Sequence, residues 1–379
     1  MTGVTMQRRS ALAVPWCSPA PPVRPGVNQQ KTRKEKRNVV VTRLAEVTRG
    51  GRVESVHDGS IVVSDASGTV IAWAGDPEQF AFFRSSAKPF QAIPVVESGA
   101  ADRFGLTDAE LALCCASHNA ERRHQEQVAA MLTKLGLSPE ALRCGCPLPS
   151  DAQEAGRVLA GLVPPSPLHC DCSGKHAGML ASCWHLGYPL DDYRKPDHPL
   201  QHMIRQIIAE VCRVDAADLA VAVDGCSVPT FGATLAAFAR AYAALAAPDR
   251  VPHDAGGAHA SALLRLQQAM MRHPENVAGQ GELVTDLMRL GRGTIVAKSG
   301  AEGLLCLGLL HMELGIAIRI ADGSFRAHPV VAAQVLSQLD AVESSVIDEI
   351  LGCHPPVVKN HNGWIAGEIR PAFQLQGSA

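Results

Sequence analysis

The stretch RSSAKPF, residues 84–90, marks the point at which the pattern of the chain changes from strands to helices. Before it, short runs rich in β-branched residues predict an antiparallel meander. These runs are residues 39–46, 52–56, 60–64 and 69–73. The pair Asp58-Gly59 predicts a hairpin turn within this meander.

After this stretch, apolar residues recur with helical spacing to about residue 290. Strand character then returns, and two short helical segments and a last strand follow it. The later strands are expected at residues 293–298, 304–312, 315–320 and 364–373, and the late helices at 330–339 and 346–351. The sequence therefore predicts an α+β fold, in which the N- and C-terminal parts build one antiparallel sheet and a helical subdomain is inserted between them.

Charge is distributed unevenly along the 379 residues. Residues 1–37 carry eight Lys or Arg and one Glu, and their Pro-rich sequence predicts a disordered basic extension. Residues 38–379 carry 27 basic and 36 acidic side chains, which argues against nucleic acid as a partner. We expect one domain over 38–379, with a sheet subdomain at 38–84 and 293–379 and a helical subdomain at 85–292.

No stretch approaches the length needed to span a bilayer, and six apolar residues at 11–16 are too few for an export signal. No membrane partner is therefore expected, and a cytoplasmic location is the default. The twelve cysteines do not require a disulfide framework in a chain of this size. Several of them fall in apolar helical patterns, where a thiol serves as a small core residue.

Outside the first 37 residues the chain contains only six lysines. Three of these six stand among Ser, Gly or Cys. Ser85 and Lys88 form an S-x-x-K element at the predicted start of a helix. One helical turn separates them, so a neutral lysine amine could take the serine proton and create a nucleophile. Alone the pattern is weak, because serine and lysine often meet at this spacing by chance.

Two further elements follow in an order that strengthens the catalytic interpretation. Ser117 begins an S-x-N element, and Lys298 begins K-S-G on a strand expected in the same sheet as the early strands. Penicillin-recognising serine enzymes use such a trio. The competing interpretation is chance: Ser117 could simply end a helix, and Lys298 could be a solvated strand residue.

A second constellation joins CSGKH, residues 172–176, to DGC, residues 224–226. Cys172, Lys175 and Cys226 would offer two thiolates and one amine, a donor set that suits zinc. From the residues alone, a structural role for two buried cysteines ranks above a metal site. A cysteine nucleophile assisted by His176 is a third interpretation.

Arg84 could hold a substrate carboxylate in a bidentate grip, or could be a surface arginine before a helix. His176 on its own is more often a packing histidine than a ligand. The sequence contains no Walker loop, no dinucleotide-binding fingerprint and no H-E-x-x-H motif.

Five sequence motifs support a resemblance to a known family, and the resemblance covers residues 39–373. They are RSSAKPFQ (84–91), CASHNAE (115–121), DCSGKHAGML (171–180), DGCSVPTF (224–231) and AKSGAEG (297–303). In these phrases the chain resembles the L-asparaginase II family, of the rhizobial inducible, zinc-containing type. The resemblance implies a fold similar to those of serine β-lactamases and glutaminases, and an asparaginase-like catalytic domain over 38–379.

The resemblance also implies roles for individual residues. It pairs Ser85 with Lys88 and Ser117 with Lys298, and it implies one Zn²⁺ per chain at Cys172, Lys175 and Cys226, with His176 and Asp224 nearby. The activity implied is hydrolysis of L-asparagine to L-aspartate and ammonia through a serine acyl-enzyme, and the assembly implied is a homodimer. In this mechanism Asp224 is the candidate for the substrate ammonium, and Arg84 for its carboxylate.

Two other function classes stay open at this point. One is a penicillin-recognising or other serine hydrolase. The other is a non-catalytic amino-acid or zinc-binding protein that keeps the fold. The intact lysines argue against the second class, because a binding protein needs no base beside Ser85.

Overall fold

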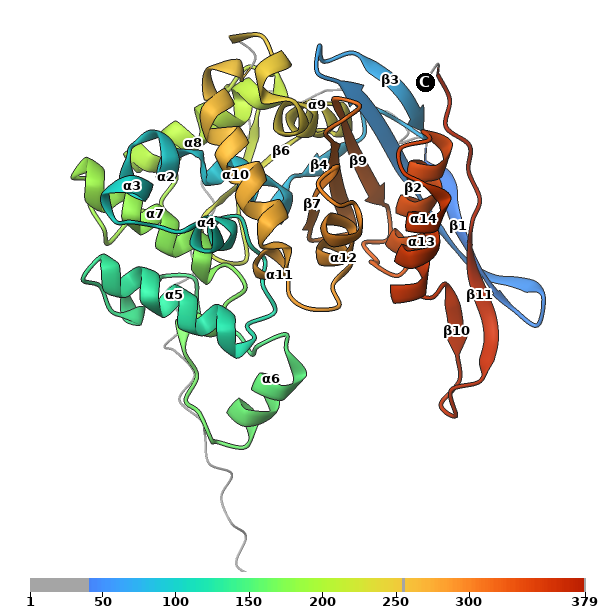
Figure 1. Ribbon diagram of the computed structural model, residues 1–379, viewed down its shortest axis with the longest axis horizontal. Coiled ribbons are helices and arrows are strands. Elements are labelled where there is room, and N and C mark those ends of the chain that lie inside the picture. Colours follow the sequence, from blue (N-terminus) through green and yellow to red (C-terminus); the bar gives the residue numbers. More distant parts are fainter. Residues whose placement is uncertain (1–40, 254–255, 378–379) are drawn as a thin grey trace, which may run out of the picture. The chain divides into compact units, whose positions relative to one another are not determined.

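The computed structural model describes residues 41–253 and 256–377, and the predicted basic extension at 1–37 lies outside these residues. Two regions far apart in the sequence form one antiparallel sheet (Figure 1). Its strand order is β10-β11-β1-β2-β9-β8-β7, and β3 pairs with β2. The predicted α+β fold, with an antiparallel sheet built from both ends of the chain, is therefore confirmed.

The strands of this sheet are bounded as follows: β1 Thr42–Arg49, β2 Arg52–Asp65, β3 Val70–Ala74, β7 Ile295–Gly300, β8 Leu304–Leu309, β9 Leu314–Ile320, β10 Val357–Lys359 and β11 Ile365–Pro371. A small second sheet, in the order β4-β6-β5, consists of Phe80–Phe82, Pro229–Thr234 and Ala220–Val223. The strand-like pattern of residues 219–223 is confirmed by β5, whereas β6 lies in the region that the sequence pattern assigns to helices.

The predicted hairpin turn at Asp58-Gly59 is wrong. Both residues lie inside β2, which runs unbroken from Arg52 to Asp65. The turn between β1 and β2 is instead at Gly50 and Gly51, whose φ angles are 55° and 77°. Two successive residues with positive φ are what a tight hairpin requires, and a Gly-Gly pair meets this demand more readily than Asp-Gly.

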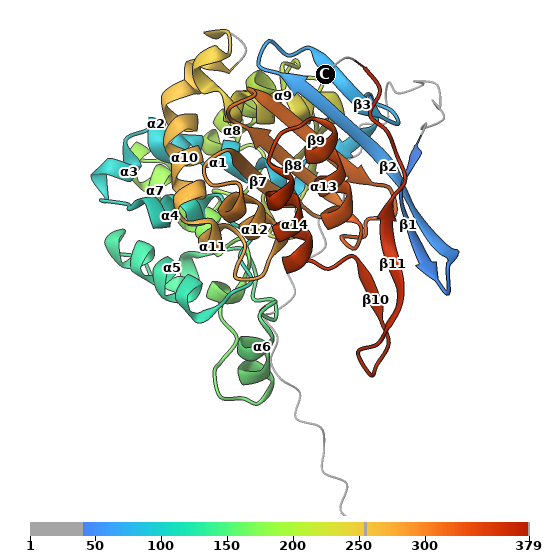
Figure 2. The same cartoon turned by 45° about the vertical axis from the view of Figure 1, so that its right-hand side comes forward.

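Helices fill the region between β4 and β7. The longer ones are α4 Asp108–Cys114, α5 Arg122–Lys134, α6 Ala152–Leu159, α7 Ser173–Leu186, α8 Pro199–Cys212, α9 Leu235–Ala246, α10 Ala260–Arg272 and α12 Leu283–Leu290. Single turns also occur: η1 Arg84–Ala87, α1 Lys88–Gln91, α2 Ile93–Glu97, α3 Ala100–Arg103, η2 Pro139–Ala141, η3 Pro167–His169, η4 Pro248–Arg250, η6 Gly257–His259 and α11 Pro274–Val277. Between β9 and β10 come α13 His328–Gln338 and α14 Ser344–Cys353, which lie in front of the sheet in Figure 2.

The helix α9 holds the sheet to the helical region. It is almost entirely buried, and it packs against β2, β8 and β9 on one side and against α8 and α10 on the other. Its sequence, LAAFARAYAALA, combines strong helix formers with small side chains, so its backbone can approach the sheet closely. Gly308 and Gly315, which pair across β8 and β9, face it.

We expect Gly315→Ala to destabilise the fold, because the added Cβ would lie 2.0 Å from the Ala239 carbonyl oxygen in the backbone of α9. The backbone cannot move aside as a side chain can, so urea unfolding should show a loss of about 3 kcal/mol. Gly352→Ala in α14 is the matched control, because nothing lies within 4 Å of its added Cβ. It should be neutral or slightly stabilising, and equal losses in both variants would contradict the close-approach explanation.

Candidate active site

Ser85 lies where the chain leaves the small sheet and turns into helices. The single turn η1 begins at Arg84, whose φ of 48° is unusual for a residue other than glycine, and α1 follows directly. Ser85 is half-buried and lines a cavity, whereas Lys88 is fully buried. No hydrogen bond joins Ser85 Oγ to Lys88 Nζ among the described residues, although the two residues lie three positions apart in η1 and α1.

Ser117 lies between two buried lysines. Its Oγ accepts hydrogen bonds from Lys88 Nζ at 2.7 Å and from Lys298 Nζ at 2.8 Å. Ser117 follows α4, and Lys298 comes from the middle of β7, so three distant parts of the sequence converge here. The predicted pair of Ser117 and Lys298 is in contact, and Lys88 joins it through its own hydrogen bond to Ser117 Oγ.

The two lysines have opposite electrostatic surroundings. Burial, and then the charge of Lys88, lowers the pKa of Lys298 to about 7. Burial also lowers the pKa of Lys88, but the negative charges of Cys172 and Asp171 outweigh it and raise that pKa overall. Lys298 is therefore the amine of this pair that is readily neutral near pH 7.

The cavity beside these groups has a volume of about 350 Å³. Ser85 and Ser117 line it together with His118, Asn119, Ser150 and Asp171, and other lining residues are Ala278, Glu282, Ser299, Gly300, Ala301 and Phe325. We call it the Ser85 cavity. Its size lies at the lower end of the range of small-molecule sites, and eight of its twelve lining residues carry polar side chains that a small polar ligand could bind.

Arg84 and Asp224, the two predicted ligands for a substrate's charges, are bound to each other. Arg84 Nε donates to Asp224 Oδ1 at 2.7 Å, and both side chains are largely buried. Asp224 comes from the turn between β5 and β6, which pairs with the β4 strand that precedes Arg84. The structure thus brings the two residues together beside Ser85, but neither lines the Ser85 cavity.

His176 is buried in α7, where its Nδ1 and the hydroxyl of Tyr193 are 2.5 Å apart. Its Nε2 has no hydrogen-bond partner among the described residues. Burial lowers the pKa of His176 to about 3, so the ring is neutral. His176 lines none of the described cavities, and Tyr193 is a partner that sequence spacing could not have revealed.

The three predicted zinc ligands converge from two places in the chain. Cys172 and Lys175 lie one turn apart at the start of α7, and Cys226 lies between β5 and β6. All three are buried, and Lys175 Nζ is 3.0 Å from Cys226 Sγ. A hydrogen bond from Cys172 lowers the pKa of Cys226 to about 5, assisted by Lys175.

This donor set fits a metal ion. Two thiols and an amine converge in a buried position, and thiolates are good ligands for zinc. The charges of Cys226 and Cys172 outweigh burial and raise the pKa of Lys175, so its ammonium neutralises the thiolates when no cation does so. A bound Zn²⁺ would take over that neutralisation and release the lysine proton.

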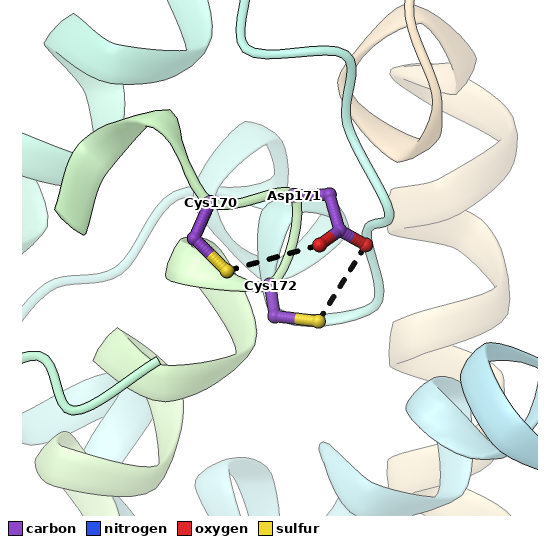
Figure 3. Close-up of side chains that lie close together, drawn as sticks. All are labelled: Cys170, Asp171 and Cys172. Carbon is purple, nitrogen blue, oxygen red and sulfur yellow. Dashed lines mark hydrogen bonds between the residues drawn. The ribbon is translucent and has the colours of Figure 1, made fainter. Parts of the chain in front are cut away.

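Asp171 links the two parts of the site and was not among the predicted residues. Its carboxylate accepts hydrogen bonds from Cys170 Sγ at 3.7 Å and Cys172 Sγ at 3.5 Å (Figure 3), and Lys88 Nζ lies 3.4 Å away. The metal-ligating atoms of Cys170, Asp171 and Cys172 all lie within 4.8 Å of one another. The signal for Asp171 was its place beside Cys172 in the phrase DCSGKHAGML, but nothing in the sequence indicated its contact with Lys88.

A cavity lined by Ser85 and Ser117, with two buried lysines hydrogen-bonded to Ser117, favours an enzyme of the amidohydrolase class. A family model described as L-asparaginase II matches residues 45–371. The chain therefore belongs to the L-asparaginase II family. No curated protein matches it by sequence.

The solved structures that match the chain are distant in sequence. The native form of the protein Mglu is 14% identical with a TM-score of 0.34; the match covers 75% of this chain and 61% of Mglu. A β-lactamase from Mycobacterium bovis is 11% identical with a TM-score of 0.37, and the match covers 78% of this chain and 94% of that enzyme. The chain thus spans less than two thirds of the length of Mglu in this form. Among the residues described, no helix is long and apolar enough to cross a membrane.

Proposed function

We propose that this protein hydrolyses L-asparagine to L-aspartate and ammonia through an acyl-enzyme on Ser85. The observation that carries the proposal is Ser117 Oγ, held between Lys88 and Lys298 in the cavity that Ser85 lines. Membership of the L-asparaginase II family supports an amide as the substrate. Two buried amines that both hydrogen-bond the Ser117 hydroxyl can move a proton toward a leaving nitrogen.

The first step is attack by Ser85 Oγ on the carbon of the side-chain amide. The serine proton passes into the Lys88, Ser117 and Lys298 network, and Ser117 delivers a proton to the amide nitrogen as the carbon–nitrogen bond breaks. Lys298 is suited to accept a proton in this exchange because burial lowers its pKa to about 7. Water then attacks the Ser85 ester by the reverse path and releases aspartate.

The developing oxyanion needs hydrogen-bond donors that are in place before the reaction. Ser85 is in the first turn of a helical segment, where backbone N–H groups lack helical partners, so its own N–H is the proposed donor. The strained φ of Arg84 belongs to the turn that presents Ser85 to the cavity.

Recognition of the substrate's charges is proposed for Arg84, Asp224 and His176. In the structure Arg84 and Asp224 neutralise each other. The α-ammonium and the α-carboxylate of an amino acid carry the same two charges. The ion pair could therefore open, with Asp224 binding the ammonium and Arg84 the carboxylate, at little electrostatic cost. Neutral His176, with its free Nε2, could contribute one hydrogen bond.

Zinc is proposed at Cys172, Lys175 and Cys226. When bound with an open coordination position, it would supply Lewis acidity or a ligand position for a substrate oxygen. Asp171 connects this cluster to the Ser117 network, because it contacts both Cys172 and Lys88.

Elemental analysis of the purified protein should find one zinc per chain. Cys226→Ser should remove it, because the loss of one thiolate typically weakens such a site strongly. Cys183→Ser is the matched control: it is a buried cysteine on α7 outside this cluster, and its replacement should leave the zinc content unchanged. Zinc retained in Cys226→Ser would contradict the ligand assignment.

Ammonia release from asparagine and from glutamine, with and without added zinc, tests the proposed function. Turnover of asparagine is the expected result. Hydrolysis of the chromogenic β-lactam nitrocefin without ammonia release would instead favour a penicillin-recognising hydrolase. Tight asparagine binding without turnover would favour a non-catalytic binding protein.

A further inference from the structure

A second cavity of about 330 Å³ adjoins the Ser85 cavity. We call it the side chamber. The two share five lining residues, which are Ser117, Ala278, Glu282, Ser299 and Phe325. A cavity of about 150 Å³ accommodates benzene, so each of the two exceeds twice that size. One molecule of asparagine therefore does not fill both.

The side chamber has an apolar wall. Leu283 and Val284 come from the first turn of α12, Leu305 comes from β8, and Pro329 comes from the start of α13. Val284 and Leu305 are buried. The ring of Phe325 stands at the border with the Ser85 cavity and is 50% exposed. Such a wall favours an apolar group over a charged one.

The polar groups of the side chamber do not provide a place for the substrate's carboxylate. No Lys or Arg lines it, and Glu282 at the border would repel a second carboxylate. The Nε2 atom of His328 is hydrogen-bonded to the Gly303 carbonyl, and burial lowers the pKa of that ring to about 4, so it is neutral. His354 Nε2 lies 3.0 Å from Asp286 Oδ2 and is hydrogen-bonded to it.

Ser117 connects the side chamber to the reaction, because it lines both cavities. This connection rests on the proposed function, in which Ser117 gives a proton to the leaving nitrogen. Ser85, the nucleophile, lines only the first cavity, whereas Ser117, the proton donor to the leaving nitrogen, lines both. When the amide carbon is at Ser85 and the amide nitrogen is at Ser117, a substituent on that nitrogen needs space beside Ser117. The side chamber, which Ser117 also lines, offers that space.

We propose that the enzyme also hydrolyses asparagines whose side-chain amide nitrogen carries an apolar group, with that group bound in the side chamber. The step is the same as for asparagine: the Ser85 oxygen bonds to the amide carbon, and the carbon–nitrogen bond breaks. The nitrogen receives one proton through Ser117 and leaves as a primary amine. Water then hydrolyses the ester to aspartate and restores the serine hydroxyl.

N4-benzyl-L-asparagine is the test substrate. Its leaving group, benzylamine, resembles ammonia in basicity, so a difference from asparagine reports fit and not leaving-group chemistry. Aspartate release is measured for both substrates with the full-length, zinc-supplemented protein. We expect kcat/KM for the benzyl compound to lie within about tenfold of that for asparagine, because the apolar wall offsets the constraint of the larger group.

Leu283→Trp tests the location, because a larger side chain would occupy part of the chamber. It should lower the ratio of kcat/KM for the benzyl compound over that for asparagine by about tenfold or more. Leu159→Trp is the matched control: Leu159 is an exposed leucine of α6 that lines none of the described cavities. It should leave this ratio unchanged.

Three results would overturn the inference. Turnover of asparagine without turnover of the benzyl compound would reject it and leave the proposed function intact. Turnover of neither substrate would reject both. Turnover of both with an unchanged ratio in Leu283→Trp would show that the benzyl group binds elsewhere.

Discussion

Ser85→Ala should lower kcat/KM for asparagine by about 10³-fold or more, equivalent to about 4 kcal/mol of transition-state stabilisation. The residue lines the cavity, and the variant loses the only proposed covalent nucleophile. Asparagine affinity should change little, because the hydroxyl makes no hydrogen bond in the described structure. Steady-state ammonia release and isothermal titration calorimetry measure the two quantities.

Ser86→Ala is the control for this prediction. Ser86 is the adjacent serine, but it is buried, and its Oγ donates to the Lys298 carbonyl at 3.1 Å. Its loss should cost about 1 kcal/mol of stability and retain most of the activity. Wild-type turnover by Ser85→Ala would show that another residue is the nucleophile.

The pH dependence of kcat/KM should reflect the neutral form of Lys298. Burial, and then the charge of Lys88, lowers the pKa of Lys298 to about 7. A base acts only when it is deprotonated, so activity should be low below this pKa, rise as pH increases through it and level off above it. Lys298→Arg should lower kcat/KM by about 10²-fold or more, because guanidinium stays protonated across this range.

Lys195→Arg is the matched control for Lys298→Arg. Lys195 is exposed and pairs with Asp192 at 2.8 Å on the surface, so its replacement should leave both activity and pH profile unchanged. An acidic limb that is unchanged in Lys298→Arg, with substantial residual activity, would assign the titration to a different group.

The sheet could be predicted from the sequence because its strands carry strong local signals. The runs of β8 and β9 are short and almost wholly apolar, and turns bound them, which is typical of buried strands. The short strand β10 and the pairing of β5 with β6 were not predicted, because three- or four-residue strands depend on their neighbours. The misplaced hairpin turn arose because both Asp-Gly and Gly-Gly satisfy the same turn geometry.

The sequence predicts which residues belong to the site, but not which of them contact one another. Spacing identified Ser85 and Lys88 as a pair, because one helical turn is a local relation. That Lys88 also binds Ser117 and lies near Asp171 follows from the packing of α1, α4 and α7, which no local pattern encodes. Similarly, the Arg84–Asp224 ion pair depends on the pairing of β4 and β5 with β6 across more than a hundred residues.

The most direct test of the acyl-enzyme on Ser85 is to trap it. The protein is mixed with asparagine, quenched in acid during turnover, digested and mapped by mass spectrometry. The account predicts an aspartyl ester on the peptide that contains residues 84–91, located at Ser85 by fragmentation and absent from Ser85→Ala. An ester on Ser117, or a thioester on Cys172 or Cys226, would contradict it.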